Sequence, residues 1–208
     1  MEEKIEIIKN WLATGSIDIF GLPFSGKDTV GLRLAETLGA KFLSSGLILR
    51  AAENEDKELA KELASGNLAP TETFLKVILP YFDRPELKNY PLVLSSVGRW
   101  SGEEYDVMAA AAEGGHEIKV VILLNISEDE AKKRWEASHV LADRGTRSDD
   151  REQSVLENRI NEFVEKTMPV INTYHERGTL IQIHATGDRD AIFNTVIDEL
   201  VKFAQEHQ

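Results

Sequence analysis

The stretch that decides the fold is Gly21-Leu22-Pro23-Phe24-Ser25-Gly26-Lys27-Asp28-Thr29. It follows a short apolar run at 17–20 and precedes apolar residues at helical spacing over 29–38. Glycines at both ends of such a loop let backbone N–H groups surround a phosphate, and the helix N-terminus and Lys27 add positive charge. A strand before the loop and a helix after it predict a phosphate-binding loop. The alternative is a glycine-rich turn with an incidental lysine.

One residue of this loop departs from the usual pattern. The residue after the lysine is normally Ser or Thr, whose hydroxyl reaches Mg²⁺, but here it is Asp28, with Thr29 next. A carboxylate suits the first turn of a helix, yet it repels a polyphosphate unless a cation lies between them. We therefore expect Asp28 and Thr29 to lie near Mg²⁺. The alternative is a helix-capping carboxylate turned away from the phosphates.

Strands and helices alternate along the rest of the chain. Strands are predicted at 41–44, 91–96, 118–124 and 179–183, and helices at 47–65, 71–82, 103–113, 128–137, 151–175 and 189–206. This alternation predicts a parallel sheet covered on both faces. The continuous apolar runs at 92–94 and 120–124 are typical of strands buried on both faces.

The chain begins with an amphipathic helix at about 4–13, which a Thr14-Gly15-Ser16 break ends. We expect this 1–14 extension to pack on the single domain formed by residues 15–208. The alternative is a contact with a partner or a second copy.

Composition excludes several classes of protein. The chain has 208 residues, of which 42% are apolar, so it can bury the core of one domain. Its 24 basic and 36 acidic residues give a net charge of −12, which argues against a surface for nucleic acid or anionic lipid. The absence of cysteine excludes disulfides and thiolate metal sites. With no apolar run of about 18 residues, we expect a cytoplasmic protein, as a monomer or weak dimer.

Five further motifs follow the phosphate loop, and their order and spacing carry more weight than any one alone. They are Leu43-Ser44-Ser45-Gly46-Leu47-Ile48-Leu49-Arg50, Gly66-Asn67-Leu68-Ala69-Pro70-Thr71-Glu72, Ser96-Val97-Gly98-Arg99, Arg147-Ser148-Asp149-Asp150, and the segment from Arg159 through Pro169 to Tyr174. From about residue 17 to the C-terminus, the chain resembles the adenylate kinase family of nucleoside monophosphate kinases. The resemblance implies a P-loop NTPase fold: a three-layer α/β/α domain with a five-stranded parallel sheet. It also implies a small helical NMP-binding segment at about 45–74 and a short lid at about 138–148.

The resemblance assigns roles to three sets of residues. It implies ATP binding by Phe24, Ser25, Gly26, Lys27, Asp28, Thr29 and Arg134, and monophosphate binding by Ser45, Gly46, Arg50, Leu68, Arg99, Glu103, Arg147 and Arg159. The implied catalytic residues are Lys27, Arg99, Arg147 and Arg159, with Asp149 and Asp150 orienting the arginines as the lid closes. The lid is too short for a zinc ribbon, so we expect no zinc and no ligand role for His139.

The basic residues make chemical sense without the family name. Phosphoryl transfer between two nucleotides gathers negative charge, so catalysis needs several cations in one cleft. Six basic residues stand at motif positions: Lys27, Arg50, Arg99, Arg134, Arg147 and Arg159. Arginine at five of the six suits forked donation to phosphate oxygens. For any one arginine, the alternative is a surface ion pair.

Several positions depart from the family pattern. In the phosphate loop, Phe24 and Asp28 replace glycines. Ser95 replaces the acid that orients Mg²⁺-bound water. In the lid, Ser138 replaces a second arginine, for which Arg144 would compensate. Arg159 lies one residue further from Asp149-Asp150 than usual. We hypothesise that Asp28 supplies the carboxylate missing at 95. Glu103 replaces the glutamine that recognises adenine. An ionised glutamate only accepts hydrogen bonds, so it could face the amino group of adenine or cytosine, or the N–H groups of guanine.

These observations lead to three hypotheses about function. The first is a Mg²⁺-dependent kinase that converts ATP and AMP into two ADP. The second is a kinase for another acceptor, either CMP, UMP or GMP or a small alcohol such as shikimate or gluconate. The third is a nucleotide-binding sensor that has lost catalysis.

Overall fold

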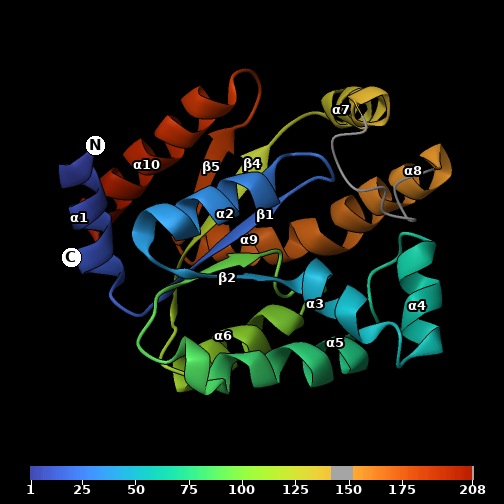
Figure 1. The fold of residues 1–208 in the computed structure, drawn as a ribbon, viewed down its shortest axis with the longest axis horizontal. Coiled ribbons are helices and arrows are strands. Elements are labelled where there is room, and N and C mark those ends of the chain that lie inside the picture. Colours follow the sequence, from blue (N-terminus) through green and yellow to red (C-terminus); the bar gives the residue numbers. More distant parts are fainter. Residues whose placement is uncertain (142–151, 208) are drawn as a thin grey trace.

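The computed structural model describes residues 1–141 and 152–207 and contains one parallel sheet (Figure 1). The strands are β1 (Ser16–Gly21), β2 (Lys41–Ser44), β3 (Leu92–Ser95), β4 (Ile118–Asn125) and β5 (Leu180–His184). They lie in the order β2-β3-β1-β4-β5 and all pair in parallel. The five-stranded parallel sheet predicted from the sequence is confirmed.

Helices cover the sheet on both faces. Crossovers between parallel strands are right-handed, and β1 leads to β2 on one side of the sheet while β3 leads to β4 on the other side. The connecting helices α2 (Lys27–Leu38) and α6 (Glu103–Glu113) therefore lie on opposite faces (Figure 1). The helix α10 (Arg189–Glu206) joins the α2 face, where Arg33 lies 4.1 Å from the ring centre of Phe193. The result is the three-layer α/β/α arrangement.

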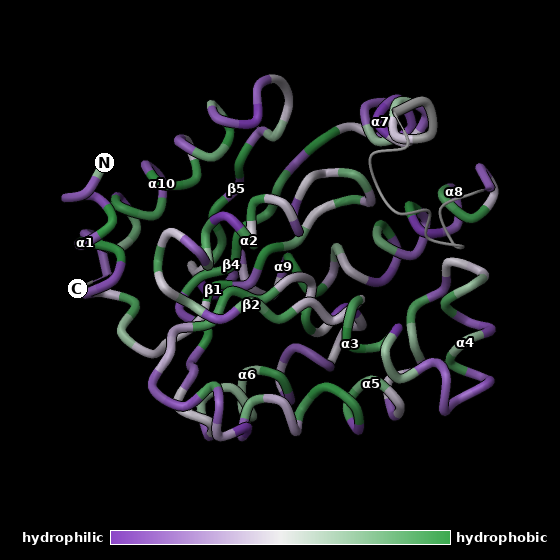
Figure 2. Tube along the Cα trace, in the orientation of Figure 1, coloured by the Kyte–Doolittle hydropathy of each residue, from purple (hydrophilic) through white to green (hydrophobic). Residues whose placement is uncertain are grey.

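The central strands are buried along their whole length because both faces are covered. Every residue of β1 and β3 is buried, and Figure 2 shows hydrophobic residues gathered along the strands at the centre of the molecule. One of the buried residues is an acid, Asp18, whose carboxylate accepts a hydrogen bond from the Val97 N–H at 3.2 Å. Burial raises the pKa of Asp18 well above its ordinary value. Asp18 thus holds the turn that leads from β3 toward Arg99.

The N-terminal helix α1 (Glu2–Leu12) packs on α10 and adds side chains to the main hydrophobic core. Ile8 and Leu12 are fully buried, and the Trp11 ring meets Phe203 of α10 edge-on at 5.7 Å. Lys4 forms an ion pair with Asp198 of α10 at 2.6 Å.

We expect Leu12→Ala to lower the free energy of unfolding by about 2–5 kcal/mol, because it leaves a cavity where a fully buried side chain packs in the core. Urea denaturation of the two proteins measures the difference. Lys4→Ala removes only an exposed ion pair and should change stability by less than about 1 kcal/mol. Equal effects of the two substitutions would contradict the buried role of α1.

The single helix predicted over 47–65 is wrong. The chain forms α3 (Ser45–Ala52) and α4 (Lys57–Ala64), separated by a short turn. Asp56 caps α4, since its carboxylate accepts from the N–H groups of Glu58 and Leu59, both at 3.0 Å. The cap starts a second helix in a new direction, which an apolar pattern alone does not reveal.

Two other predicted helices are subdivided at prolines. α5 (Thr71–Ile78) passes into a 3₁₀ turn, Leu79–Asp83, at Pro80, and a second 3₁₀ turn spans Pro85–Leu87. The stretch predicted at 151–175 is α8 (Gln153–Glu162), a π-helical turn (Phe163–Thr167) and α9 (Met168–Glu176). Pro169 has no N–H to donate and its ring crowds the carbonyl four residues earlier, which explains the π turn before it. α7 (Glu128–Leu141) runs past its predicted end at 137.

Candidate active site

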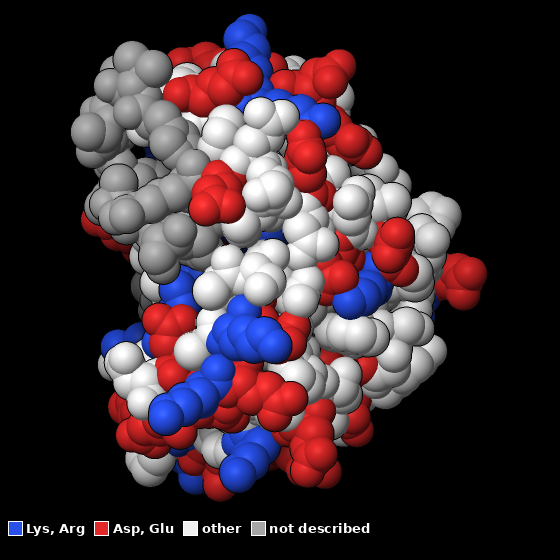
Figure 3. Space-filling model, turned by 90° about the vertical axis from the view of Figure 1, so that its right-hand side faces the viewer, with Lys and Arg blue, Asp and Glu red and all other residues white. Residues whose placement is uncertain are grey.

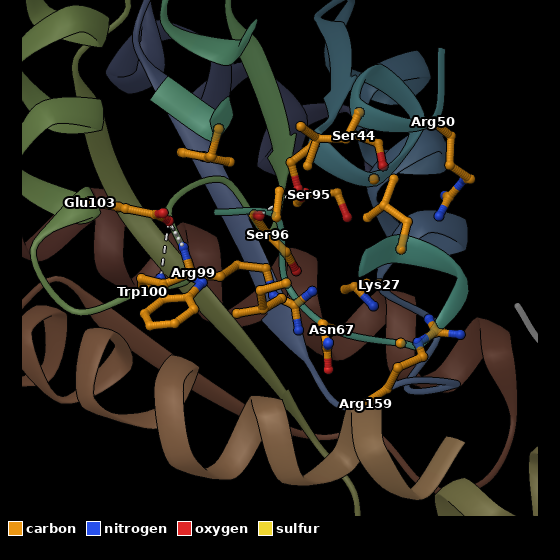
Figure 4. A pocket seen from close by; sticks show the side chains of 18 of the residues that line it. Lys27, Ser44, Arg50, Asn67, Ser95, Ser96, Arg99, Trp100, Glu103 and Arg159 are labelled. Carbon is orange, nitrogen blue, oxygen red and sulfur yellow. Dashed lines mark hydrogen bonds between the residues drawn. The ribbon is translucent and has the colours of Figure 1, made fainter. Parts of the chain in front are cut away.

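The carboxyl ends of β1, β2 and β3 open onto one pocket (Figure 4). The loop after β1 supplies Lys27, α3 after β2 supplies Arg50, and the turn after β3 supplies Arg99. Arg159 of α8 joins them. Figure 4 shows Glu103 and Trp100 at one end of the pocket and Lys27, Arg50 and Arg159 toward the other end. Ligands of open parallel sheets bind at this edge, so the fold places four of the six motif cations where an anion would bind.

The phosphate loop has the shape that its glycines predict. Gly26 has φ 93° and precedes the first residue of α2. A Cβ added to Gly21 would lie 2.4 Å from Ser25 Oγ and 2.8 Å from the Leu124 carbonyl oxygen, so no larger residue fits there. Phe24 has φ 64°, a left-handed conformation that is costly for an aromatic residue. The loop therefore keeps the conformation of a glycine at 24, and the Phe24 side chain packs on the core.

Two of the departures from the family pattern meet in space. The Ser95 hydroxyl donates to Asp28 Oδ1 at 2.6 Å, although the two residues are 67 positions apart. Asp28 and Ser95 both line the pocket beside Lys27. Because the Asp28 carboxylate points toward the end of β3 and into the pocket, this contact argues against the alternative in which it turns away from the phosphates. A carboxylate thus lies at the end of β3 even though the strand itself ends in serine.

The α3 side of the pocket depends on a glycine and two hydroxyls. A Cβ at Gly46 would lie 3.1 Å from Arg50 Nη2, so glycine gives the guanidinium room to lie against the start of its own helix. The Ser45 hydroxyl donates to the Ser96 carbonyl oxygen at 2.7 Å, and Ser44 caps α3 through the Leu47 N–H. These bonds fasten the first turn of α3 to the end of β3.

Arg99 lies beside a second cation. Burial and the positive charge of Arg159 lower the pKa of Arg99 to about 10, and the negative charges of Glu162 and Glu103 partly oppose this. The guanidinium is still charged at neutral pH. Two cations held together in a pocket repel each other until an anion binds between them. This arrangement suits a phosphate.

The sequence did not reveal Glu162, an acid that ties α8 to the pocket. Its Oε2 accepts from the Leu68 N–H at 3.0 Å, and its Oε1 pairs with Lys166 Nζ at 2.5 Å. Lys166 in turn lies over the Trp100 ring, 4.1 Å from its centre. Leu68, predicted to bind the acceptor, is therefore fixed through its backbone.

A second set of contacts joins α8 to the loop after α4. The Asn158 amide donates to the Ser65 carbonyl oxygen at 2.9 Å and to Asn67 Oδ1 at 2.6 Å. A Cβ at Gly66 would lie 2.8 Å from the Val155 carbonyl oxygen and 2.9 Å from Arg159 Cγ. The 65–68 loop packs directly on the helix turn that carries Arg159, so both contribute to one wall.

The sequence model of the adenylate kinase family matches residues 19–179, and this stretch contains every pocket residue. The chain belongs to the adenylate kinase family. It is 29% identical to an adenylate kinase of Phocaeicola vulgatus over 90% of this chain and 98% of that protein. It is 31% identical to adenylate kinase 1 of Schistosoma mansoni over 90% of this chain and 93% of the relative. An adenylate kinase of Methanococcoides burtonii is 27% identical over 90% of this chain.

Membership establishes the chain as a phosphotransferase of the nucleoside monophosphate kinase type, which confirms the resemblance, the fold and the enzyme class. Over residues 1–141 and 152–207, no helix is long and apolar enough to cross a membrane. Figure 3 shows acidic and basic residues mixed over the face that carries α4 and α8.

Arg134 of this adenylate kinase family member lies outside the pocket. Its Nη2 donates to the Ala185 carbonyl oxygen at 2.7 Å and its Nη1 reaches the Phe24 and Ser25 carbonyl oxygens at 3.4 Å. Glu130 pairs with its Nε at 2.8 Å. Arg134 therefore lies over the outer side of the phosphate loop.

The remaining predicted residues have varied positions. Thr29 is exposed in the first turn of α2, and the Ser138 hydroxyl bonds to the Trp135 carbonyl oxygen in α7. Outside the described residues lie Arg144, Arg147, Asp149 and Asp150, the lid from 142 to 148, and the side chain of His139. Within the described part of the chain, no three His, Asp or Glu side chains are grouped to hold a metal.

Proposed function

We propose that the protein transfers the γ-phosphoryl group of ATP to AMP, forming two ADP, with Mg²⁺. The observation that carries this proposal is the convergence of Lys27, Arg50, Arg99 and Arg159 on one pocket. Since phosphoryl transfer is catalysed mainly by positioning and charge stabilisation, four cations in one pocket are the chemistry that the reaction needs.

The proposed roles follow the two sides of the pocket. On the ATP side, the N–H groups of the loop from Phe24 through Ser25 and Gly26 to Thr29 hold the phosphates, Lys27 contacts the outer ones, and Arg134 flanks the base. On the acceptor side, Arg50 and Arg99 hold the AMP phosphate beside Ser45, Gly46, Leu68 and Glu103. Arg159 and Arg147 stabilise the group in transfer. The NMP-binding segment at about 45–74 and the lid at about 138–148 close over both nucleotides to exclude water.

The donor atoms near Lys27 fit Mg²⁺. Asp28 offers a carboxylate beside the Ser95 hydroxyl, and Thr29 offers a hydroxyl in the same helix turn. Mg²⁺ commonly keeps several waters and uses one or two carboxylates together with substrate phosphates, so one carboxylate is sufficient. When bound, the ion neutralises charge on the transferring phosphates. We propose that Asp28 does from α2 what the family's acid does from the end of β3.

We expect Asp28→Gly to raise the Mg²⁺ concentration needed for tight binding of a non-hydrolysable ATP analogue by about tenfold, because the carboxylate beside the ion is lost. Asp28→Gly combined with Ser95→Asp returns a carboxylate to the end of β3 and should restore most of the lost Mg²⁺ affinity. Calorimetric titration of Mg²⁺ into the analogue complex measures it without relying on turnover.

Ser95→Ala is the control, since it removes the 2.6 Å hydrogen bond and leaves the carboxylate in place. It should shift the Mg²⁺ requirement much less than Asp28→Gly does. Unchanged Mg²⁺ dependence in Asp28→Gly would contradict a metal role for this residue.

An ADP-formation assay against AMP, CMP, UMP, GMP and dTMP tests the proposed function. Fastest turnover with AMP supports it, while a clear preference for another monophosphate would change the acceptor and keep the reaction type. Tight ATP binding without turnover of any monophosphate would contradict the proposal and favour the sensor hypothesis. A cytoplasmic location and a monomeric or weakly dimeric state stay predictions.

A further inference from the structure

Glu103 is a buried acid with one oxygen already engaged. The side chain is only 2% exposed at the start of α6. Its Oε2 accepts from the Arg99 N–H at 2.9 Å and from the Trp100 N–H at 3.0 Å (Figure 4). An oxygen that accepts two N–H groups carries no proton itself. Any proton on Glu103 therefore lies on the other oxygen, Oε1.

Oε1 is the part of Glu103 left for a ligand. It is buried and has no hydrogen bond of ordinary geometry, while the side chain lines the pocket. The Thr71 hydroxyl lies near enough to lower the pKa of Glu103. A buried polar atom without a good partner is unfavourable, so a bound group that pairs with it gains affinity.

The position of Glu103 matches the base of the acceptor nucleotide. It lies at the end of the pocket away from Lys27, Arg50 and Arg159 (Figure 4). With the acceptor phosphate on the cations, its base reaches toward Glu103. Purine edges differ at the ring nitrogen that Oε1 would meet, since N1 of adenine is a bare acceptor and N1 of guanine carries a hydrogen.

We propose that Oε1 of Glu103 selects the acceptor base through its proton. Protonated, it donates to N1 of adenine, and ionised, it accepts from the N1–H of guanine. The preferred acceptor then shifts from AMP toward GMP as the pH rises. This inference rests on the proposed function and names the determinant of its substrate choice.

The surroundings of Glu103 favour a proton. Burial raises its pKa, and the two backbone N–H groups, Thr71 and the charge of Arg99 oppose this less strongly. Glu104, next on α6, is bonded elsewhere, to the Gly102 N–H at 2.6 Å and the Thr173 hydroxyl at 3.1 Å.

The other charged groups near Glu103 do not mimic its titration. Lys166, which lies over the Trp100 ring, forms an ion pair with Glu162. Arg159 lies at the other end of the pocket (Figure 4). Among the described residues that line the pocket, the other acid is Asp28, on the Lys27 side, and none is a histidine.

The test is the ratio of kcat/KM for AMP to kcat/KM for GMP, measured from about pH 5.5 to about pH 8.5. Titrations of ATP and of the phosphate common to both acceptors cancel in this ratio. We expect it to fall at least about tenfold in the wild-type protein, the value of one good hydrogen bond to a buried charged group. The ratio of the AMP and GMP dissociation constants, from calorimetry without ATP, should change in parallel.

Glu103→Gln removes the titration and keeps the geometry. Its amide oxygen can accept from the Arg99 and Trp100 N–H groups, and its NH₂ then stands in the place of Oε1 as a permanent donor. We expect a ratio that favours AMP at every pH. Glu104→Gln is the matched control, because it neutralises the neighbouring buried acid and should keep the wild-type pH dependence.

A pH-independent ratio in the wild-type protein would overturn the inference, as would an equal fall in Glu103→Gln. The wild-type ratio decides the question even where the variant does not fold. Phosphoryl transfer with a flat ratio contradicts only the role of Glu103. The absence of transfer to any monophosphate contradicts the proposed function, and the calorimetric ratio then still tests the base preference.

Discussion

Lys27→Met is expected to abolish phosphoryl transfer while leaving the fold intact. Lys27 is the first residue of α2, directly after Gly26, and it is partly exposed in the pocket. Methionine keeps most of the apolar stem and removes the charge. Losing one preorganised cation at the transferring phosphates costs at least about 10³-fold in kcat.

A coupled ADP assay measures the loss, and thermal unfolding shows that the variant remains folded. The control is Arg33→Met on the same helix, where the guanidinium pairs with Asp190 at 2.5 Å and stacks on Phe193. It removes the same charge away from the pocket and should leave turnover unchanged. Wild-type activity in Lys27→Met would refute the assignment of the phosphate loop.

Much of this fold could be predicted from local sequence. The phosphate loop is contiguous: its glycines, its lysine and the flanking strand and helix all lie between residues 16 and 38. The strands 92–94 and 120–124 could be recognised because strands buried on both faces need continuous apolar runs. Local signals also give α10, whose predicted range, 189–206, matches Arg189–Glu206.

The contacts that shape the pocket could not be predicted, because they join distant residues. Ser95 and Asp28 are 67 positions apart, and Glu162 reaches a backbone N–H 94 positions away. Each of these acids looks like any of the 36 in the chain. Only the three-dimensional arrangement shows that Asp28 lies against the end of β3 and that Glu162 fastens α8 to the 65–68 loop.

Asp18 illustrates the same limit inside a strand. Asp18 interrupts the apolar run of β1, between Ile17 and Ile19. Its carboxylate is buried and accepts a hydrogen bond from the Val97 N–H. The turn after β3 contains Ser96 with φ 54°, a strained conformation for serine. A buried acceptor that holds the next N–H stabilises this turn, which no pattern of hydrophobicity encodes.

Arg99→Ala is expected to weaken binding of the acceptor nucleotide by about 10²- to 10³-fold, with ATP affinity nearly unchanged. Burial and the charge of Arg159 lower the pKa of Arg99 to about 10. Binding of a phosphate dianion supplies the opposite charge and therefore stabilises the guanidinium strongly. Truncating one partner of such a buried charged pair costs about 2–5 kcal/mol. Calorimetry with AMP and with a non-hydrolysable ATP analogue separates the two sides of the pocket.

The control for Arg99 is Arg84→Ala, which removes an exposed arginine paired with Glu86 and stacked on Tyr81, outside the pocket. Thermal unfolding adds a second readout, because a ligand raises stability by RT ln(1 + [L]/Kd). Saturating AMP should raise the melting temperature of the wild-type protein and of Arg84→Ala, and of Arg99→Ala far less. An equal loss of ATP affinity in Arg99→Ala would place this arginine between the two nucleotides rather than on the acceptor side, and so contradict its proposed role.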